Sequence, residues 1–163
     1  GLNIPWYDQK VTHLFGLEPS AVLQAEAAEL AAAASTPFPV EFLTAGAESI
    51  PLERSSMDCV VSTWTLCSIP DLDLALAEIR RVLKPGGQLL FLEHGRAPDA
   101  AVARWQDRLA PVFRGLAGCN PNRQIDASIE AAGFRFTAME RSYFDGPRFI
   151  SWHFVGSATP DGK

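Results

Sequence analysis

The stretch DLDLALAEIRRVLKPGGQLLFLE, residues 71–93, decides the fold class of this chain. Its first half predicts a helix that begins after the N-cap Asp71 and has one apolar face, formed by Leu72, Ala75, Leu76, Ile79, Val82 and Leu83. Residues 84–87, Lys-Pro-Gly-Gly, predict the end of that helix, because a last-turn cation, a proline ring and glycines all favour termination. Residues 88–93 then predict a central parallel strand.

The same alternation of strand and helix patterns runs through the rest of the chain. The apolar segments predict further strands at residues 11–17, 40–44, 58–63, 134–138 and 149–155, of which 58–63 is of the fully buried type. Helical patterns cover residues 19–34, with Pro19 in the first turn, 99–116, with a kink or break at Pro111, and 122–132, closed by Gly133. The sequence therefore predicts an α/β fold with a mostly parallel sheet, ending in an antiparallel strand pair around residues 145–147.

The helix pattern at residues 99–116 predicts which side chains face the core, and the composition of the chain excludes several classes of partner. The apolar face of helix 99–116 is predicted to comprise Val102, Trp105, Leu109, Phe113 and Leu116. A net charge of −5 argues against a nucleic-acid partner, and no apolar run reaches the ~20 residues of a membrane helix. Three cysteines without CxxC spacing predict neither a disulfide framework nor a metal site, and indicate reduced thiols in a cytoplasmic protein.

Four motifs, in this order and at these spacings, carry a family resemblance. They are GLEPS at 16–20, AGAESIPL at 45–52, the segment from MDCVVS at 57–62 to Pro70-Asp71, and RRVLKPGGQL at 80–89. Together they resemble the class I S-adenosylmethionine-dependent methyltransferases, nearest to the small-molecule type of the ubiquinone and menaquinone C-methyltransferases. The chain is also similar to thiol-methylating methyltransferase-like proteins. The resemblance covers residues 1 to about 95.

The resemblance implies a Rossmann-like methyltransferase fold in a single domain over residues 1–163 that is incomplete at its N-terminus. The family's first, central strand and its GxGxG-type loop would lie upstream of Gly1, which would be the last glycine of that loop. We therefore expect the native protein to contain further residues before Gly1.

The implied cofactor is S-adenosyl-L-methionine, with S-adenosyl-L-homocysteine as product. The resemblance assigns Glu18, followed by Pro19, to the ribose hydroxyls, although an acid near a helix N-terminus is also stabilised by the helix dipole. It assigns the adenine side to Gly46, Ala47 and Glu48, and the methionine side to Gly1, Ser62, Thr63 and Trp64. Trp64 would either cover the adenine or pack in the core.

The acceptor side of the site would follow the strands at 58–63 and 88–93. His94 lies at a strand end and suits a general base acting on a hydroxyl or thiol, or else a structural role. Cys67 would face the transferring methyl as a small buried hydrophobe rather than a nucleophile. Arg96 would pair with an anionic acceptor group or lie on the surface, and Asn122 would cap a helix or contact substrate. His13 and His153, placed within strands, are expected to be structural.

The predicted function is methyl transfer to an S, O, N or C atom of a small-molecule acceptor. Two alternatives stay open at this stage. A Rossmann NAD(P)-dependent oxidoreductase is disfavoured because the chain has no Tyr-x-x-x-Lys pair and no dinucleotide fingerprint. A noncatalytic partner subunit with the same fold is the other, because a fold does not imply a function. The sequence names neither the acceptor nor an oligomeric state.

Overall fold

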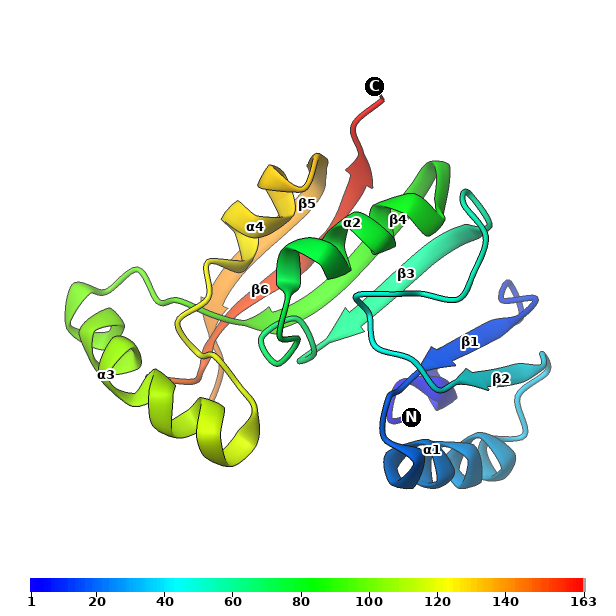
Figure 1. Ribbon diagram of the computed structural model, residues 1–163, viewed down its shortest axis with the longest axis horizontal. Helices are drawn as coiled ribbons and strands as arrows, with labels where there is room; N and C mark the ends of the chain where they lie inside the picture. The colour runs from blue at the N-terminus through cyan, green and yellow to red at the C-terminus, as the bar shows by residue number, and fades with distance from the viewer. Residues whose placement is uncertain (163) are drawn as a thin grey trace. The chain divides into compact units, whose positions relative to one another are not determined.

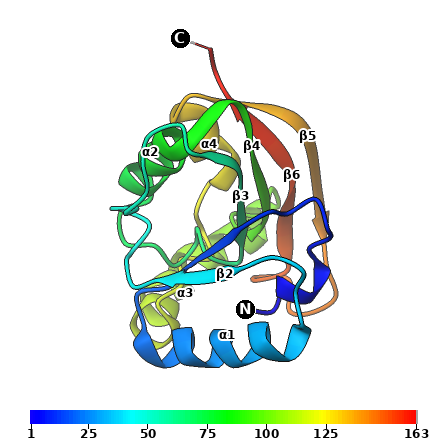
Figure 2. The same cartoon turned by 90° about the vertical axis from the view of Figure 1, so that its right-hand side faces the viewer.

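The computed structural model describes residues 1–162, which form two compact units divided between Pro51 and Leu52. The first unit contains a 3-10 helix η1 (Ile4–Trp6), strand β1 (Leu14–Leu17), helix α1 (Ala21–Ala34) and strand β2 (Val40–Leu43). Strands β1 and β2 pair in parallel, and α1 connects them as a βαβ crossover (Figures 1 and 2). Both strands therefore end at the same edge of this small sheet.

Local contacts explain the limits of the first unit's elements. Ser20 is the N-cap of α1 and accepts a hydrogen bond from the Leu23 amide, so Pro19 precedes the cap instead of lying in the first turn as predicted. The first strand begins at Leu14 rather than Val11, and His13 lies just before it. A side chain at Gly1 would bring its Cβ to 2.9 Å from the Cα of Ala27, so only glycine permits this approach to α1.

The second unit is a four-stranded mixed sheet with three helices. Its strands are β3 (Met57–Thr63), β4 (Leu83–His94), β5 (Phe134–Tyr143) and β6 (Trp152–Pro160), in the order β3-β4-β6-β5. Strands β3 and β4 are parallel, whereas β6 runs antiparallel to both β4 and β5, which confirms the predicted C-terminal antiparallel pair. The helices are α2 (Leu72–Val82), α3 (Ala100–Ala117) and α4 (Ile125–Ala131), and Figure 1 shows α2 and α4 in front of the sheet.

Helix α2 forms as its sequence predicts. The Asp71 carboxylate accepts a hydrogen bond from the Leu74 amide at 3.0 Å, and all six residues of the predicted apolar face are buried. The predicted termination is displaced, because α2 ends at Val82 and β4 already begins at Leu83. Residues 84–87 therefore interrupt the pairing of β3 with β4 instead of lying in the last helical turn, and Lys84 Nζ forms an ion pair with Asp58 at 2.8 Å.

The predicted apolar face of α3 is wrong. Trp105 is 56% exposed and Leu116 86% exposed, whereas Ala103, Gln106 and Ala110 are buried. The cause is the side-chain amide of Gln106. Its Nε2 lies within hydrogen-bond distance of three backbone carbonyls, and its oxygen accepts from the Ala97 amide at 2.9 Å. These bonds fix the rotation of the helix. Pro111 lies inside one continuous helix and does not divide it.

Two other boundaries, and the predicted full burial of the strand at residues 58–63, differ from the structure. Helix α4 begins at Ile125 after the N-cap Gln124, so Asn122 is not its cap and instead donates to Asp107 Oδ1 at 3.1 Å. Strand β6 begins at Trp152 rather than Phe149, because residues 147–150 form a turn in which the Ile150 amide donates to Pro147. Strand β3 buries only Ser62, since it is the edge strand of its sheet. No helix within residues 1–162 has the length and hydropathy of a membrane span.

The tight packing of β6 yields a stability prediction. A Cβ added at Gly156 would lie 2.3 Å from the Ala138 carbonyl oxygen and 2.8 Å from the Phe91 ring. Gly156→Ala should lower the free energy of unfolding by about 1–3 kcal/mol, as overpacking does. Gly115→Ala in α3 is the control, because its Cβ would meet no atom within 4 Å and alanine favours a helix. Urea denaturation measures both, and equal stability of the Gly156→Ala protein and the parent would contradict the packing described.

Candidate active site

A buried carboxylate organises the loop that follows β3. Glu93, next to last in β4, is 0% exposed. Its Oε1 accepts hydrogen bonds from the Ser62 hydroxyl at 2.7 Å and the Thr65 amide at 3.0 Å, and its Oε2 accepts from the Leu66 amide at 3.1 Å. Burial raises the pKa of Glu93 despite these bonds. The carboxylate thus folds the chain back sharply after β3, where Trp64 takes a positive φ of 50°.

A pocket of about 430 Å³ opens beside this loop, within the second unit. Its apolar walls come from Trp64, Phe113, Pro147 and Ile150. Its polar side chains are Cys67, Ser68, His94, Cys119, Asp145, Ser151 and His153. Because β3 and β4 are parallel, their carboxyl ends meet at this rim, which is where open α/β sheets bind ligands. The pocket is therefore the candidate active site of this unit.

Two thiols flank one histidine inside the pocket. His94 Nε2 lies 3.0 Å from Cys67 Sγ and 3.1 Å from Cys119 Sγ, and His94 Nδ1 lies 3.3 Å from the Ile150 carbonyl oxygen. Because a carbonyl can only accept, Nδ1 carries the proton of the neutral ring and Nε2 is left as an acceptor. Cys67 is 2% exposed, whereas Cys119 is half-buried.

The pKa values of Cys67, His94 and Cys119 are all shifted from those of isolated side chains. The hydrogen bond with Cys119, together with burial, strongly raises the pKa of Cys67. The same bond lowers the pKa of Cys119, against the effect of burial. Burial alone would lower the pKa of His94, but its contacts with Cys67 and the Ile150 carbonyl outweigh burial and raise it. Of the two thiols, Cys119 is consequently the one that ionises first.

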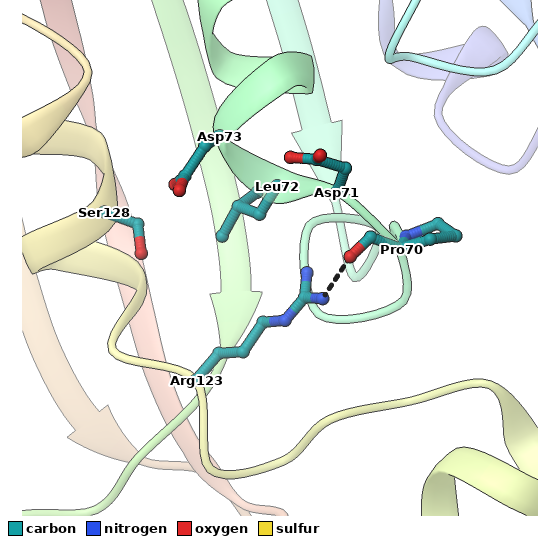
Figure 3. Close-up of a pocket in the computed structure, with 6 residues that line it drawn as sticks. All are labelled: Pro70, Asp71, Leu72, Asp73, Arg123 and Ser128. Atoms are coloured by element: carbon teal, nitrogen blue, oxygen red, sulfur yellow. Dashed lines mark hydrogen bonds between the residues drawn. The ribbon is translucent and has the colours of Figure 1, made fainter.

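Hydrogen bonds to main-chain carbonyls hold the two cysteine loops together. Asn120 donates to the Cys67 carbonyl from its amide at 2.9 Å and from its side chain at 3.2 Å. Arg123 donates to the carbonyls of Leu66 at 2.5 Å and Ile69 at 2.6 Å, and it reaches the Pro70 carbonyl at the start of α2, as Figure 3 shows. The proximity of the thiols thus follows from fixed main-chain positions rather than from side-chain rotamers alone.

Other predicted acceptor-side residues lie apart from this pocket. Arg96 forms a two-pronged ion pair with Asp107, at 2.5 and 3.0 Å, and Asn122 donates to the same carboxylate. Neither residue lines the pocket. His153, expected to be structural, does line it; its Nδ1 lies 2.8 Å from the Ser151 carbonyl, and its ring centre is 6.2 Å from that of His94.

The predicted nucleoside-binding residues gather at one edge of the first unit. Glu18 directly follows β1, and residues 46–48 follow β2, so both segments leave the carboxyl edge of this parallel pair. The Glu18 amide donates to the Leu43 carbonyl at 3.1 Å, and its carboxylate accepts from the Ser20 amide at 2.8 Å. A Cβ at Gly46 would lie 2.8 Å from Glu48 Oε2. Ser62, Thr63 and Trp64 lie at the end of β3 in the second unit.

Sequence reasoning missed three residues that build the pocket: Cys119, Asn120 and the buried Glu93. A charged residue at the end of an apolar strand was the available signal for Glu93. No sequence signal marks Cys119, because 51 positions separate it from Cys67.

Comparison with known proteins identifies the class of this chain. Residues 1–91, more than half of the chain, match the family model described as "Methyltransferase domain", so the chain belongs to that family. A solved SAM-dependent methyltransferase from Methanosarcina mazei shares the fold, with a TM-score of 0.67 and 19% identity over 94% of this chain and 84% of that one.

Sequence relatives narrow the comparison to two groups of enzymes. Thiol S-methyltransferase TMT1B from Rattus norvegicus is 40% identical over 124 residues, which cover 72% of this chain and 50% of the rat enzyme. Ubiquinone/menaquinone biosynthesis C-methyltransferase UbiE from Hahella chejuensis is 41% identical over 68 residues, 42% of this chain and 27% of that enzyme. The match therefore spans half the length of the rat enzyme and about a quarter of the UbiE enzyme.

The role of Glu93 is testable by an isosteric change. In Glu93→Gln the side-chain NH₂ replaces one acceptor oxygen, so a donor among Ser62, Thr65 and Leu66 loses its partner. We expect the free energy of unfolding to fall by about 1–3 kcal/mol and the Thr65 or Leu66 amide to exchange faster with deuterium. Glu140→Gln, at an exposed position of β5, should change stability by less than about 0.5 kcal/mol. Unchanged exchange at both amides would refute the anchoring role.

Proposed function

We propose that this protein transfers a methyl group from S-adenosyl-L-methionine to a small-molecule acceptor, with a thiol as the favoured class. The observation that carries the proposal is the pocket at the carboxyl ends of β3 and β4, in a chain of the methyltransferase family. The name of the rat relative supports a sulfur acceptor, and the name of UbiE supports the wider small-molecule class.

The residues of the first unit fit the nucleoside part of the cofactor. A carboxylate such as that of Glu18 accepts hydrogen bonds from two neighbouring hydroxyls, and it stands at the same sheet edge as Gly46. At Gly46 the absence of a side chain lets the Glu48 carboxylate approach the backbone closely. We propose that Glu18 binds the ribose and residues 46–48 line the adenine, with Gly1 and Pro19 contributing from the same unit.

The protein's contribution to the reaction is alignment and exclusion of water. S-adenosyl-L-methionine would supply a methyl group already activated by its positive sulfur. The apolar walls of the pocket, Trp64, Phe113, Pro147 and Ile150, desolvate the acceptor atom and restrict its approach. We propose that deprotonation of a thiol or hydroxyl substrate depends on His94. Its ring lines the pocket, and its Nε2 carries no proton in the neutral form, so it can accept a hydrogen bond.

The setting proposed for this activity is cytoplasmic, with a small-molecule partner and no nucleic acid. The net charge of −5 supports the exclusion of nucleic acid, since a phosphate-binding groove needs clustered positive charge. Free rather than bridged cysteines support a reducing compartment.

Replacement of Glu18 tests the cofactor assignment. Glu18→Gln removes a charged acceptor and should weaken S-adenosyl-L-homocysteine binding about 10- to 100-fold, the value of one hydrogen bond to a charged group. Isothermal titration calorimetry measures this affinity. Glu29→Gln, at an exposed position of α1, should bind like the parent. Equal affinity of the Glu18→Gln protein would remove Glu18 from the site.

Replacement of His94 tests the acceptor side. His94→Ala should lower kcat for a small thiol such as 2-mercaptoethanol about 10²- to 10⁴-fold, because the acceptor is no longer deprotonated in the pocket. Affinity for S-adenosyl-L-homocysteine should stay unchanged, which separates this effect from loss of the fold. His13→Ala, in the first unit just before β1, is the matched control. Unchanged turnover in the His94→Ala protein would end its assignment to the reaction.

A further inference from the structure

Three metal-binding side chains converge in the pocket from three separate parts of the chain. Cys67 comes from the loop after β3, His94 from the end of β4, and Cys119 from the loop after α3. Their Sγ, Nε2 and Sγ atoms all lie within 4.8 Å of one another. The side chains of Asn120 and Arg123 donate to main-chain carbonyls of the loop at residues 66–70 and fix this convergence.

The single acceptor nitrogen of His94 cannot bind both thiols through hydrogen bonds. With its Nδ1 proton directed at the Ile150 carbonyl, the neutral His94 ring offers a single lone pair, on Nε2. Two S–H groups lie 3.0 and 3.1 Å from that one atom, so only one of them can donate to it. A cation bound by two sulfurs and one nitrogen would engage all three atoms at once.

We propose that Cys67, His94 and Cys119 form a zinc site whose fourth position faces the pocket. A ligand set of two thiolates and one imidazole is typical of zinc, which binds sulfur at about 2.3 Å and nitrogen at about 2.0–2.1 Å. Tetrahedral geometry at those bond lengths separates sulfur from nitrogen by about 3.5 Å. The separations of 3.0 and 3.1 Å need an adjustment of about half an ångström.

The surroundings of the three ligands match those of metal-bound residues. Zinc-bound histidines usually donate their second ring N–H to a carboxylate, a carbonyl or water, as His94 does to Ile150. Half-buried His94 and Cys119 leave a way in from the pocket, while Cys67 closes the inner side.

The open fourth position of the zinc site indicates which class of methyl acceptor would bind. This part of the proposal rests on the proposed function. Three protein ligands with one exchangeable position are the pattern of catalytic zinc. A thiol acceptor bound there would release its proton to solvent and stay as a thiolate. Its sulfur lone pair would form the new S–CH₃ bond while the sulfonium S–CH₃ bond breaks, and that electron pair would stay on the departing S-adenosylhomocysteine sulfur. His94 would then support deprotonation as a zinc ligand.

Direct metal measurement tests the site without reference to activity. The reduced full chain, freed of metal and kept in a phosphine reductant, is titrated with Zn²⁺ against a chromophoric chelator. We expect one Zn²⁺ per chain, and affinity more than about 100-fold weaker in Cys67→Ser and Cys119→Ser. The control is Cys59→Ser, an exposed cysteine of β3 outside the cluster, which should bind as the parent does. Circular dichroism verifies that each variant is folded.

Cobalt provides a readout that needs no variant. Co²⁺ bound to the unaltered protein should give thiolate-to-cobalt charge-transfer absorption and the strong visible bands of a tetrahedral site. Absence of stoichiometric Zn²⁺ binding, an octahedral cobalt spectrum, or unweakened zinc affinity in folded Cys119→Ser would each overturn the proposal. Titration of S-adenosyl-L-homocysteine into the zinc-free protein tests the proposed function separately: retained binding there with no zinc binding overturns the metal site alone.

Discussion

The buried carboxylate of Glu93 is the constraint on which the architecture of the pocket depends. An interior strand carries Glu93 out of water, so its charge must be met by hydrogen-bond donors. All three donors come from residues 62–66, and the chain must therefore turn back over the end of β4. Strand alternation then directs the next residue, His94, to the other side, toward the thiol of Cys67. One buried charge thus determines where a loop, a histidine and a cysteine meet.

The fold was predictable where a single periodic signal dominates. In α2 the apolar spacing, the Asp71 cap and the buried face agree, because the helix packs on the sheet with one continuous stripe. In α3 the apolar stripe was misleading, since the side chain that decides which face is buried is polar. Gln106 satisfies four backbone groups that belong to segments distant in sequence, and no periodicity analysis contains those partners. Asn122 failed as a cap for the same reason, because Asp107 binds its side chain.

The candidate site was predictable to the extent that it depends on strand ends. Trp64, Cys67 and His94 follow two parallel strands, and the structure does place them around one pocket. The second thiol was not predictable, because Cys119 reaches the pocket through bonds of Asn120 to the Cys67 carbonyl. The expectation of no metal site rested on the absence of short CxxC spacing, a criterion for ligands on one loop. It says little about ligands that come from three loops of a folded sheet.

Family membership and the choice of methyl acceptor depend on different parts of the chain. The family match ends at residue 91, three positions before His94. Of the apolar walls, only Trp64 lies within the matched segment, whereas Phe113, Pro147 and Ile150 lie beyond it. The same is true of Cys119. The matched segment therefore provides the frame and the edge at which we propose nucleoside binding, while the chain after β4 supplies most of the surface that an acceptor would touch. Asn120 and the Arg123 guanidinium tie that segment to main-chain carbonyls of the loop after β3, so the other side chains of the segment can change selectivity without altering the frame.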